Sequence, residues 1–181
     1  MISKSLKYNG LMMIFLFISY QSWSQKGVNL IQPSVQVNIP TGNLADNVNT
    51  GYGAALKGML GVGKVPQHLT LEVGYNRFGV KNLPLSVDAS YSSIPAYFGY
   101  RARLGGLTIE SQAGVAFNHI EGSGPLGTVS SNQTSFGWAI SAGYVYRNVE
   151  LAVRYQNSES ENDTYAIRFV GIRLAYNISL K

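Results

Sequence analysis

The sequence predicts an all-β fold, an antiparallel up-and-down barrel of eight strands. Apolar and polar side chains alternate through nearly the whole chain from Val28 onward, and no long segment has the 3.6-residue period of an amphipathic helix. The alternating segments are longer than most soluble strands, and the connections between them are alternately long and short. A meander closed into a barrel has this arrangement, with long loops at one end and tight turns at the other.

The first four strands are predicted from apolar residues that alternate with glycine or polar residues. In the first of them, for example, Val35, Val37 and Ile39 alternate with Gln36 and Asn38. One face of each strand is therefore apolar and the other is polar or small. The predicted ranges are 28–39, 51–63, 69–76 and 91–104.

The last four strands follow the same rule, as where Phe136 and Trp138 alternate with Gly137. Residues 165–169 alternate in the opposite phase to the rest of the last strand, so we expect a bulge or a strand start near Phe169. The predicted ranges are 107–118, 135–146, 149–156 and 170–179.

The connections fall into two classes. Gly105 and Gly106 form a predicted two-residue hairpin loop, which places Arg101 opposite Glu110 on the facing strand. The predicted long polar loops are 40–49, 80–90, 119–133 and 157–163, and the short turns are 64–68, 105–106 and 147–148.

The polar face of the strands is too poor in charge to be the outside of a soluble barrel. Only 13% of the residues are charged, and this face consists mainly of Gly, Ser, Asn, Gln and Thr. We therefore place the polar face inside, where small residues let the wall close and the few charges must be matched because burying a lone ion is costly. The apolar face then points outward to lipid, which makes the barrel transmembrane. The predicted lumen charge network is Lys57, Glu72, Arg101, Arg103, Glu110, Glu150, Arg154 and Arg173.

Aromatic residues of the apolar face lie near both ends of the strands. Aromatic rings favour the interface between lipid and water, so two belts of rings are expected around a transmembrane barrel. Towards the short turns they are Tyr100, Tyr144, Tyr146 and Tyr176, and towards the long loops Tyr52, Tyr75, Phe117, Phe136 and Tyr155.

The N-terminus has the pattern of a secretory signal peptide. Lys4 and Lys7 precede an apolar run over residues 11–18, and cleavage is predicted between Ser24 and Gln25. The run is shorter than the roughly 20 residues that a membrane-spanning helix needs. We therefore predict a signal peptide at 1–24 and a single exported barrel domain at 25–181.

Composition argues against several other functions. The chain has no Cys, which excludes a disulfide framework and thiolate metal sites. Its Lys and Arg residues are scattered rather than clustered, so nucleic acid is not an expected partner. His119, Glu121 and Ser123 lie close together in sequence beside the third long loop, and a catalytic site there is the weaker alternative to a solvated loop. We expect no enzyme activity, no metal and no cofactor.

The chain resembles the small outer-membrane β-barrel family of the OmpA/OmpX type, in particular the barrel proteins of Bacteroidota. The resemblance covers residues 26–181 and rests on the segments IPTGNLADNVNTGYGAALKG, LEVGYNRFG, ISAGYVYRN and VGIRLAYNISLK, together with SWSQ at the predicted cleavage site. It implies a location in the cell outer membrane, with both barrel termini in the periplasm and the long loops outside.

The leading functional hypothesis is a structural or interaction protein of the outer membrane. Its four loops would serve adhesion, envelope integrity or partner binding, its lumen would be closed by paired charges, and the barrel would act as a monomer surrounded by lipid. A barrel of eight strands is just wide enough for its own side chains to fill, so an open channel is not expected. The alternatives are a soluble periplasmic carrier of the lipocalin kind, a lipid-modifying enzyme, and a narrow path for solutes through the charged lumen.

Overall fold

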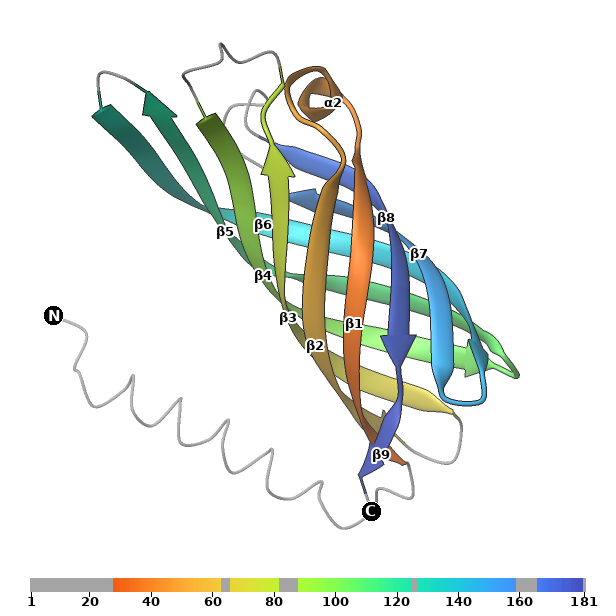
Figure 1. Ribbon diagram of the computed structural model, residues 1–181. Helices are drawn as coiled ribbons and strands as arrows, with labels where there is room; N and C mark the ends of the chain where they lie inside the picture. The colour runs from red at the N-terminus through yellow and green to blue at the C-terminus, as the bar shows by residue number, and fades with distance from the viewer. Residues whose placement is uncertain (1–27, 63–65, 82–87, 125–126, 159–165, 181) are drawn as a thin grey trace, which may run out of the picture.

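The computed structural model describes residues 28–62, 66–81, 88–124, 127–158 and 166–180, and these form a closed antiparallel barrel (Figure 1). The predicted fold class, an eight-stranded barrel, is confirmed. The predicted signal peptide lies outside the described residues. No helix in the described part of the chain is long and apolar enough to cross a membrane. The elements are β1 (Asn29–Pro40), α2 (Asn43–Asn47), β2 (Gly51–Val62), β3 (Gln67–Gly79), β4 (Asp88–Leu104), β5 (Leu107–Gly124), β6 (Gly127–Tyr146), β7 (Val149–Ser158), β8 (Ile167–Tyr176) and β9 (Ile178–Leu180).

The barrel closes through β1, which pairs with β2 on one side and with β8 and β9 on the other. The strands β8 and β9 are one barrel strand interrupted at Asn177, because the register against β1 is the same on both sides of the break. At the break, the backbone N–H of Asn177 donates instead to the carbonyl of Asn148, 2.7 Å away. The chain thus finishes the barrel at the end opposite α2 (Figure 1).

The hairpin at Gly105 and Gly106 has the predicted register. Arg101 faces Glu110, and Leu104 faces Leu107. Gly105 has φ 64°, a left-handed backbone conformation in which a residue without Cβ is not strained. The tight turn therefore fixes which side chains of β4 and β5 share the inner face.

The prediction of a long loop at 119–133 is wrong. β5 continues to Gly124 and β6 begins at Gly127, and the two strands stay paired throughout this region. β4 also pairs with β5 as far as Asp88 opposite Ser123. β3 stays paired with β4 as far as Gly79 opposite Ser90, whereas the described part of β7 pairs with β6 only as far as Gly137. The ends of β5 and β6 therefore project beyond β7 as a sheet extension (Figure 1). The polar composition misled the prediction, since a strand with water on both faces needs no apolar alternation.

Of the two features expected near Phe169, the strand start is confirmed and the bulge is absent, since β8 begins at Ile167 and keeps one register along β7. Ile167 and Phe169 instead continue the inward-facing phase of β8. Their side chains are fully buried in an apolar cluster that closes the lumen beneath α2. The buried members are Leu44, Val48, Phe78, Tyr91, Ile167 and Phe169.

Tyr97 packs across the inner face of the wall in the middle of the barrel. It is fully buried, and Gly114, Gly137 and Ser158 follow it in register on β5, β6 and β7. Its hydroxyl oxygen lies 3.5 Å from Ser158 Oγ, and either hydroxyl can donate this hydrogen bond. A Cβ built on Gly137 would clash with that phenol oxygen and with the ring itself. The ring of Tyr97 therefore occupies the space that the glycine leaves free.

Replacing Gly137 by alanine is accordingly expected to destabilise the barrel by about 1–3 kcal/mol, the usual cost of overpacking a tight interior. The measurement is the urea midpoint of unfolding of the purified protein in detergent. Gly122→Ala is the matched control, because a Cβ there meets nothing within 4 Å. Equal midpoints for the two variants would contradict the packing described for Tyr97.

Candidate functional site: a paired-charge lumen inside an apolar wall

Seven of the eight residues predicted for the lumen charge network lie inside the barrel. Their relative exposure is 3% or less, and they come from β2, β3, β4, β5, β7 and β8. Each is on the inward-facing phase of its strand, the phase predicted to be polar. They are Lys57, Glu72, Arg101, Glu110, Glu150, Arg154 and Arg173.

Glu72 is the centre of one half of this network. Its carboxylate lies 2.7 Å from Arg173 Nη1, 3.0 Å from Arg154 Nη1 and 3.3 Å from Lys57 Nζ. Arg173 also donates from Nη2 to the other oxygen of Glu72, so the two groups form a bidentate pair. One buried carboxylate thus balances cations that come from three other strands.

The other half of the network joins Arg101 to Glu150 and Glu110. Both Nη groups of Arg101 donate to the Glu150 carboxylate, and its Nη1 lies 3.5 Å from Glu110. Lys57 connects the two halves, since its Nζ lies 2.6 Å from Glu110 as well as close to Glu72. The charges therefore form one continuous network across the lumen.

Arg103 does not join this network, and its predicted place there is corrected. It lies near the end of β4, where its side chain is only half-buried. Its Nε donates to the carbonyl of Gly105, 2.7 Å away. A long side chain two residues from a tight turn reaches the turn's own carbonyl more readily than the mid-barrel carboxylates.

Buried amides, which the candidate residues did not include, complete the network. Gln36 accepts two hydrogen bonds from Arg173, and Gln112 accepts one from Arg154. Gln32 donates to Glu150 at 2.6 Å. All three occupy the polar phase of their strands, so the same alternation could have identified them. With these groups the mid-lumen is filled by side chains that crosslink opposite walls, as expected for a barrel of this size.

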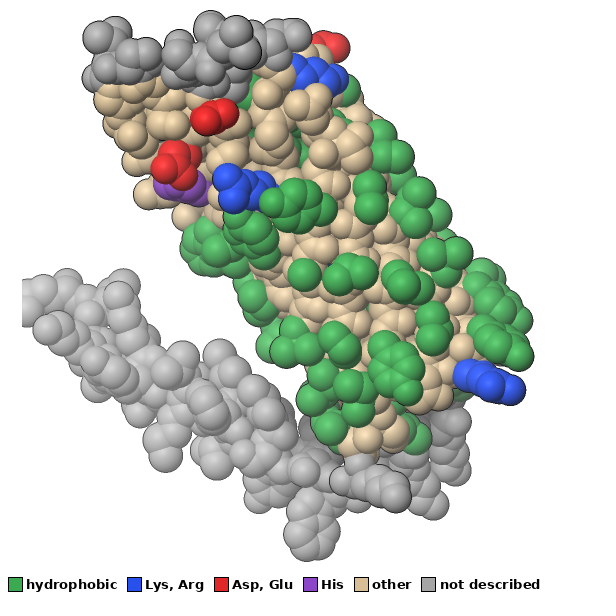
Figure 2. Space-filling view, viewed as in Figure 1, with side chains coloured by type: hydrophobic (Ala, Val, Ile, Leu, Met, Phe, Trp, Pro, Cys, Tyr) green, Lys and Arg blue, Asp and Glu red, His purple; other side chains and the backbone are tan. Residues whose placement is uncertain are grey.

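The outer wall has the opposite character. Large apolar side chains stand exposed on every long strand, as do Val35 at 59%, Leu71 at 62% and Leu151 at 59%. Figure 2 shows hydrophobic side chains spread over the sides of the barrel, with charged side chains towards its two ends. A folded chain in water rarely exposes apolar surface so extensively, so this wall fits a lipid environment.

The aromatic residues predicted for two belts all lie on this outer wall, exposed by 36% or more. On β6 the belts are marked by Phe136 and Tyr146, which are ten residues apart. At roughly 3.3 Å per residue and a tilt of about 40°, this separation is about 25 Å along the barrel axis. That height equals the apolar band of transmembrane barrels.

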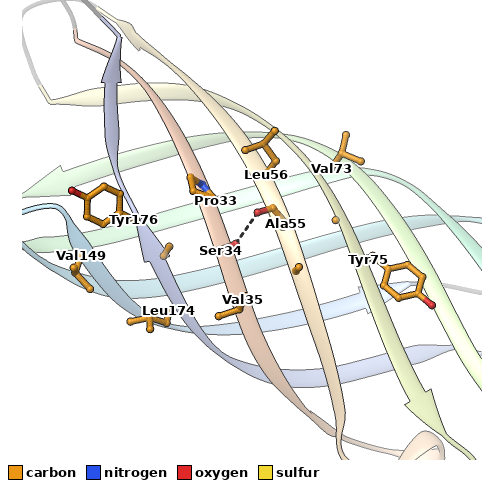
Figure 3. Close-up of a pocket in the computed structure, with 13 residues that line it drawn as sticks. Pro33, Ser34, Val35, Ala55, Leu56, Val73, Tyr75, Val149, Leu174 and Tyr176 are labelled. Carbon is orange, nitrogen blue, oxygen red and sulfur yellow. Dashed lines mark hydrogen bonds between the residues drawn. The ribbon is translucent and has the colours of Figure 1, made fainter.

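A shallow recess in the outer wall shows how little polarity this surface has. It lies over β1, β2, β3 and β8, where Pro33, Val35, Leu56 and Tyr75 point from neighbouring strands (Figure 3). None of its described lining residues is charged. The hydroxyl of Ser34 donates to the carbonyl of Ala55 at 3.4 Å. Such a surface suits packing against hydrocarbon chains.

His119, Glu121 and Ser123 share the outward face of β5 in the sheet extension. His119 Nδ1 lies 2.6 Å from Asn132 Oδ1 on β6, and its Nε2 lies 4.0 Å from the Glu121 carboxylate. The hydroxyl of Ser123 donates to the backbone carbonyl of Asp88 rather than to the imidazole. The structure therefore does not bring these residues together as a nucleophile and its base. In the described part of the chain, no three His, Asp or Glu side chains are grouped as metal ligands.

Comparison with known proteins gives similarity in structure only. No protein-family model matches the sequence, and no curated protein matches it. Among solved structures, Ail, the attachment invasion locus protein of Yersinia pestis, superposes with a TM-score of 0.62 at 13% identity, covering 84% of this chain and 99% of Ail. The N-terminal barrel domain of Pseudomonas aeruginosa OprF superposes with a TM-score of 0.54 at 12% identity, covering 85% of this chain and 99% of that domain. Neisserial surface protein A superposes with a TM-score of 0.53 at 16% identity, covering 84% of this chain and 97% of that protein.

These similarities define the class of fold. The chain has the architecture of the small eight-stranded barrels of bacterial outer membranes, with a polar, ion-paired interior and an apolar exterior.

Proposed function

We propose that the protein is an integral barrel of the outer membrane, with a structural or interaction role carried by the end that bears α2 and the sheet extension. The observation that carries this proposal is that ionic groups fill the inside of the barrel and apolar side chains cover its outside, the reverse of a protein dissolved in water. Buried charges crosslink the wall, and the apolar exterior meets lipid. The barrel acts as a monomer surrounded by lipid, and the resemblance in sequence favours a Bacteroidota-type envelope.

The sheet extension is the part of the molecule best placed to meet a partner. It projects beyond β7, and its side chains at Thr128, Ser130, Ser131 and Asn132 are exposed. A rigid paired sheet presents such groups at lower entropic cost than a free loop. The similar protein Ail was solved in complex with the heparin analogue sucrose octasulfate. We propose that extracellular or envelope partners bind this chain at the extension.

The orientation follows from the same proposal, with the extension outside the cell and both barrel termini in the periplasm. Because the chain has no Cys, single cysteines can report it directly. Ser130→Cys in the extension is expected to react with a membrane-impermeant maleimide in intact cells. Pro66→Cys, exposed beside a short turn, is expected to react only after lysis. The reverse pattern would refute the orientation, and labelling of neither residue in a membrane fraction would refute the location.

A further inference from the structure

A recess of about 200 Å³ opens into the barrel at the end with the short turns. Its polar lining comes from four separate strand ends and turns. Arg101 forms its inner part, below the rim that Arg103 and Arg147 share. The lining includes His68, Arg101, Arg103, Arg147, Asn148 and Asn177.

The lining is strongly biased towards positive charge. None of its described residues is Asp or Glu. Arg101 is balanced from below by Glu150 and Glu110, but within the described part of the chain neither Arg103 nor Arg147 contacts a carboxylate. The Nε of Arg103 donates a hydrogen bond to the turn carbonyl of Gly105, so its two Nη groups remain available to a ligand. The guanidinium of Arg147 lies 5.6 Å from the Tyr146 ring centroid.

His68 supplies a second and independent feature. It is 8% exposed and lies opposite Arg101 in the β3–β4 register. Its Nδ1 is buried and has no hydrogen-bond partner in the described structure. A buried polar atom without a partner is costly, so a ligand group that bonds to it would stabilise the site.

We propose that this recess binds a phosphate group, either free inorganic phosphate or the headgroup of a phosphomonoester lipid. The forked guanidinium donors of Arg103 and Arg147 match phosphate oxygens. A hydrogen phosphate also carries an O–H, which can donate to the unpartnered nitrogen of a neutral His68. Sulfate has the same size and oxygens but no such proton at neutral pH, so the site is expected to prefer phosphate over sulfate.

The test is a ³¹P NMR titration of the purified full-length protein in detergent micelles at pH 7, with inorganic phosphate as the probe and sulfate as competitor. We expect saturable binding that sulfate displaces only weakly. The double variant Arg103→Gln/Arg147→Gln should bind phosphate at least tenfold more weakly. Arg77→Gln, which alters an exposed arginine at the other end of the barrel, is the matched control and should bind normally.

A His68→Phe variant separates the two features of the site. It should retain part of the affinity and lose the preference for phosphate over sulfate, and heat-modifiable mobility in SDS verifies that each variant is folded. Equal phosphate affinity in Arg77→Gln and in the double arginine variant would overturn the proposal. A parallel titration with short-chain phosphatidic acid identifies the source, since tighter binding than inorganic phosphate assigns the site to a lipid headgroup and equal or weaker binding assigns it to the free ion.

Discussion

Glu72→Gln is expected to lower the free energy of unfolding by about 3–5 kcal/mol, the cost of removing one partner of a buried ion pair. The carboxylate lies within 3.3 Å of Lys57, Arg154 and Arg173, and Arg154 is completely buried. Glutamine keeps the shape but leaves these cations without their central counter-charge. The measurement is the urea midpoint of the purified protein in detergent, read from heat-modifiable mobility in SDS.

Two further variants make this result specific to the buried network. Glu121→Gln removes a carboxylate that is 53% exposed and should leave the midpoint within about 0.5 kcal/mol of the unaltered protein. Adding Arg154→Met to Glu72→Gln removes the stranded cation and should recover part of the lost stability. If Glu72→Gln unfolds at the same urea concentration as Glu121→Gln, the network does not stabilise the barrel.

Leu71→Arg is expected to destabilise the barrel in bilayers by about 2–4 kcal/mol, the cost of an arginine on the lipid face near the membrane midplane. Leu71 is 62% exposed on β3, between the two aromatic belts. On a barrel surrounded by water, the same substitution would be nearly neutral. The measurement is the free energy of unfolding in phospholipid vesicles.

The matched control for this variant is Leu107→Arg. Leu107 is 45% exposed at the start of β5, beside the tight turn and directly opposite Tyr144 of the belt near the short turns. An arginine there can reach the interface, so the expected cost is about 0–1 kcal/mol. A smaller loss of stability for Leu71→Arg than for Leu107→Arg would contradict the placement of the membrane between the belts.

Much of the fold could be predicted because alternation with period two records which face of each strand is buried. A closed barrel has an inside and an outside along its whole height. The alternation alone therefore predicted the strands, the polar lumen and the inward position of residues such as Glu72 and Arg173. The pattern failed where both faces of a strand meet water. The sheet extension, rich in Ser, Thr and Asn, therefore looked like a loop.

The partners inside the lumen could not be predicted from the sequence. Strand pairing accounts for two neighbouring pairs, Arg101 with Glu110 at 3.5 Å and Lys57 with Glu72 at 3.3 Å, and only the first of them was predicted, from the tight turn between its strands. The closer contacts join strands on opposite walls, as in the bidentate bonds from Arg101 on β4 to Glu150 on β7. Such contacts depend on the diameter of the closed barrel and on side-chain length, which no local pattern records. The opposite phase of Phe169 is visible in the sequence, but its burial inside the barrel was not predicted, because an apolar cluster replaces the polar lumen at that rim.

The central claim, that the apolar wall faces hydrocarbon, is tested most directly by the fluorescence of Trp138. This residue lies on β6 between the exposed Phe136 and Ile140, and it is the only tryptophan from residue 25 onward. In vesicles of phospholipid brominated along the acyl chain, the residue 25–181 chain is expected to show strong quenching of Trp138, with little effect of aqueous acrylamide. Weak quenching by the brominated chains and strong quenching by acrylamide would contradict a transmembrane barrel.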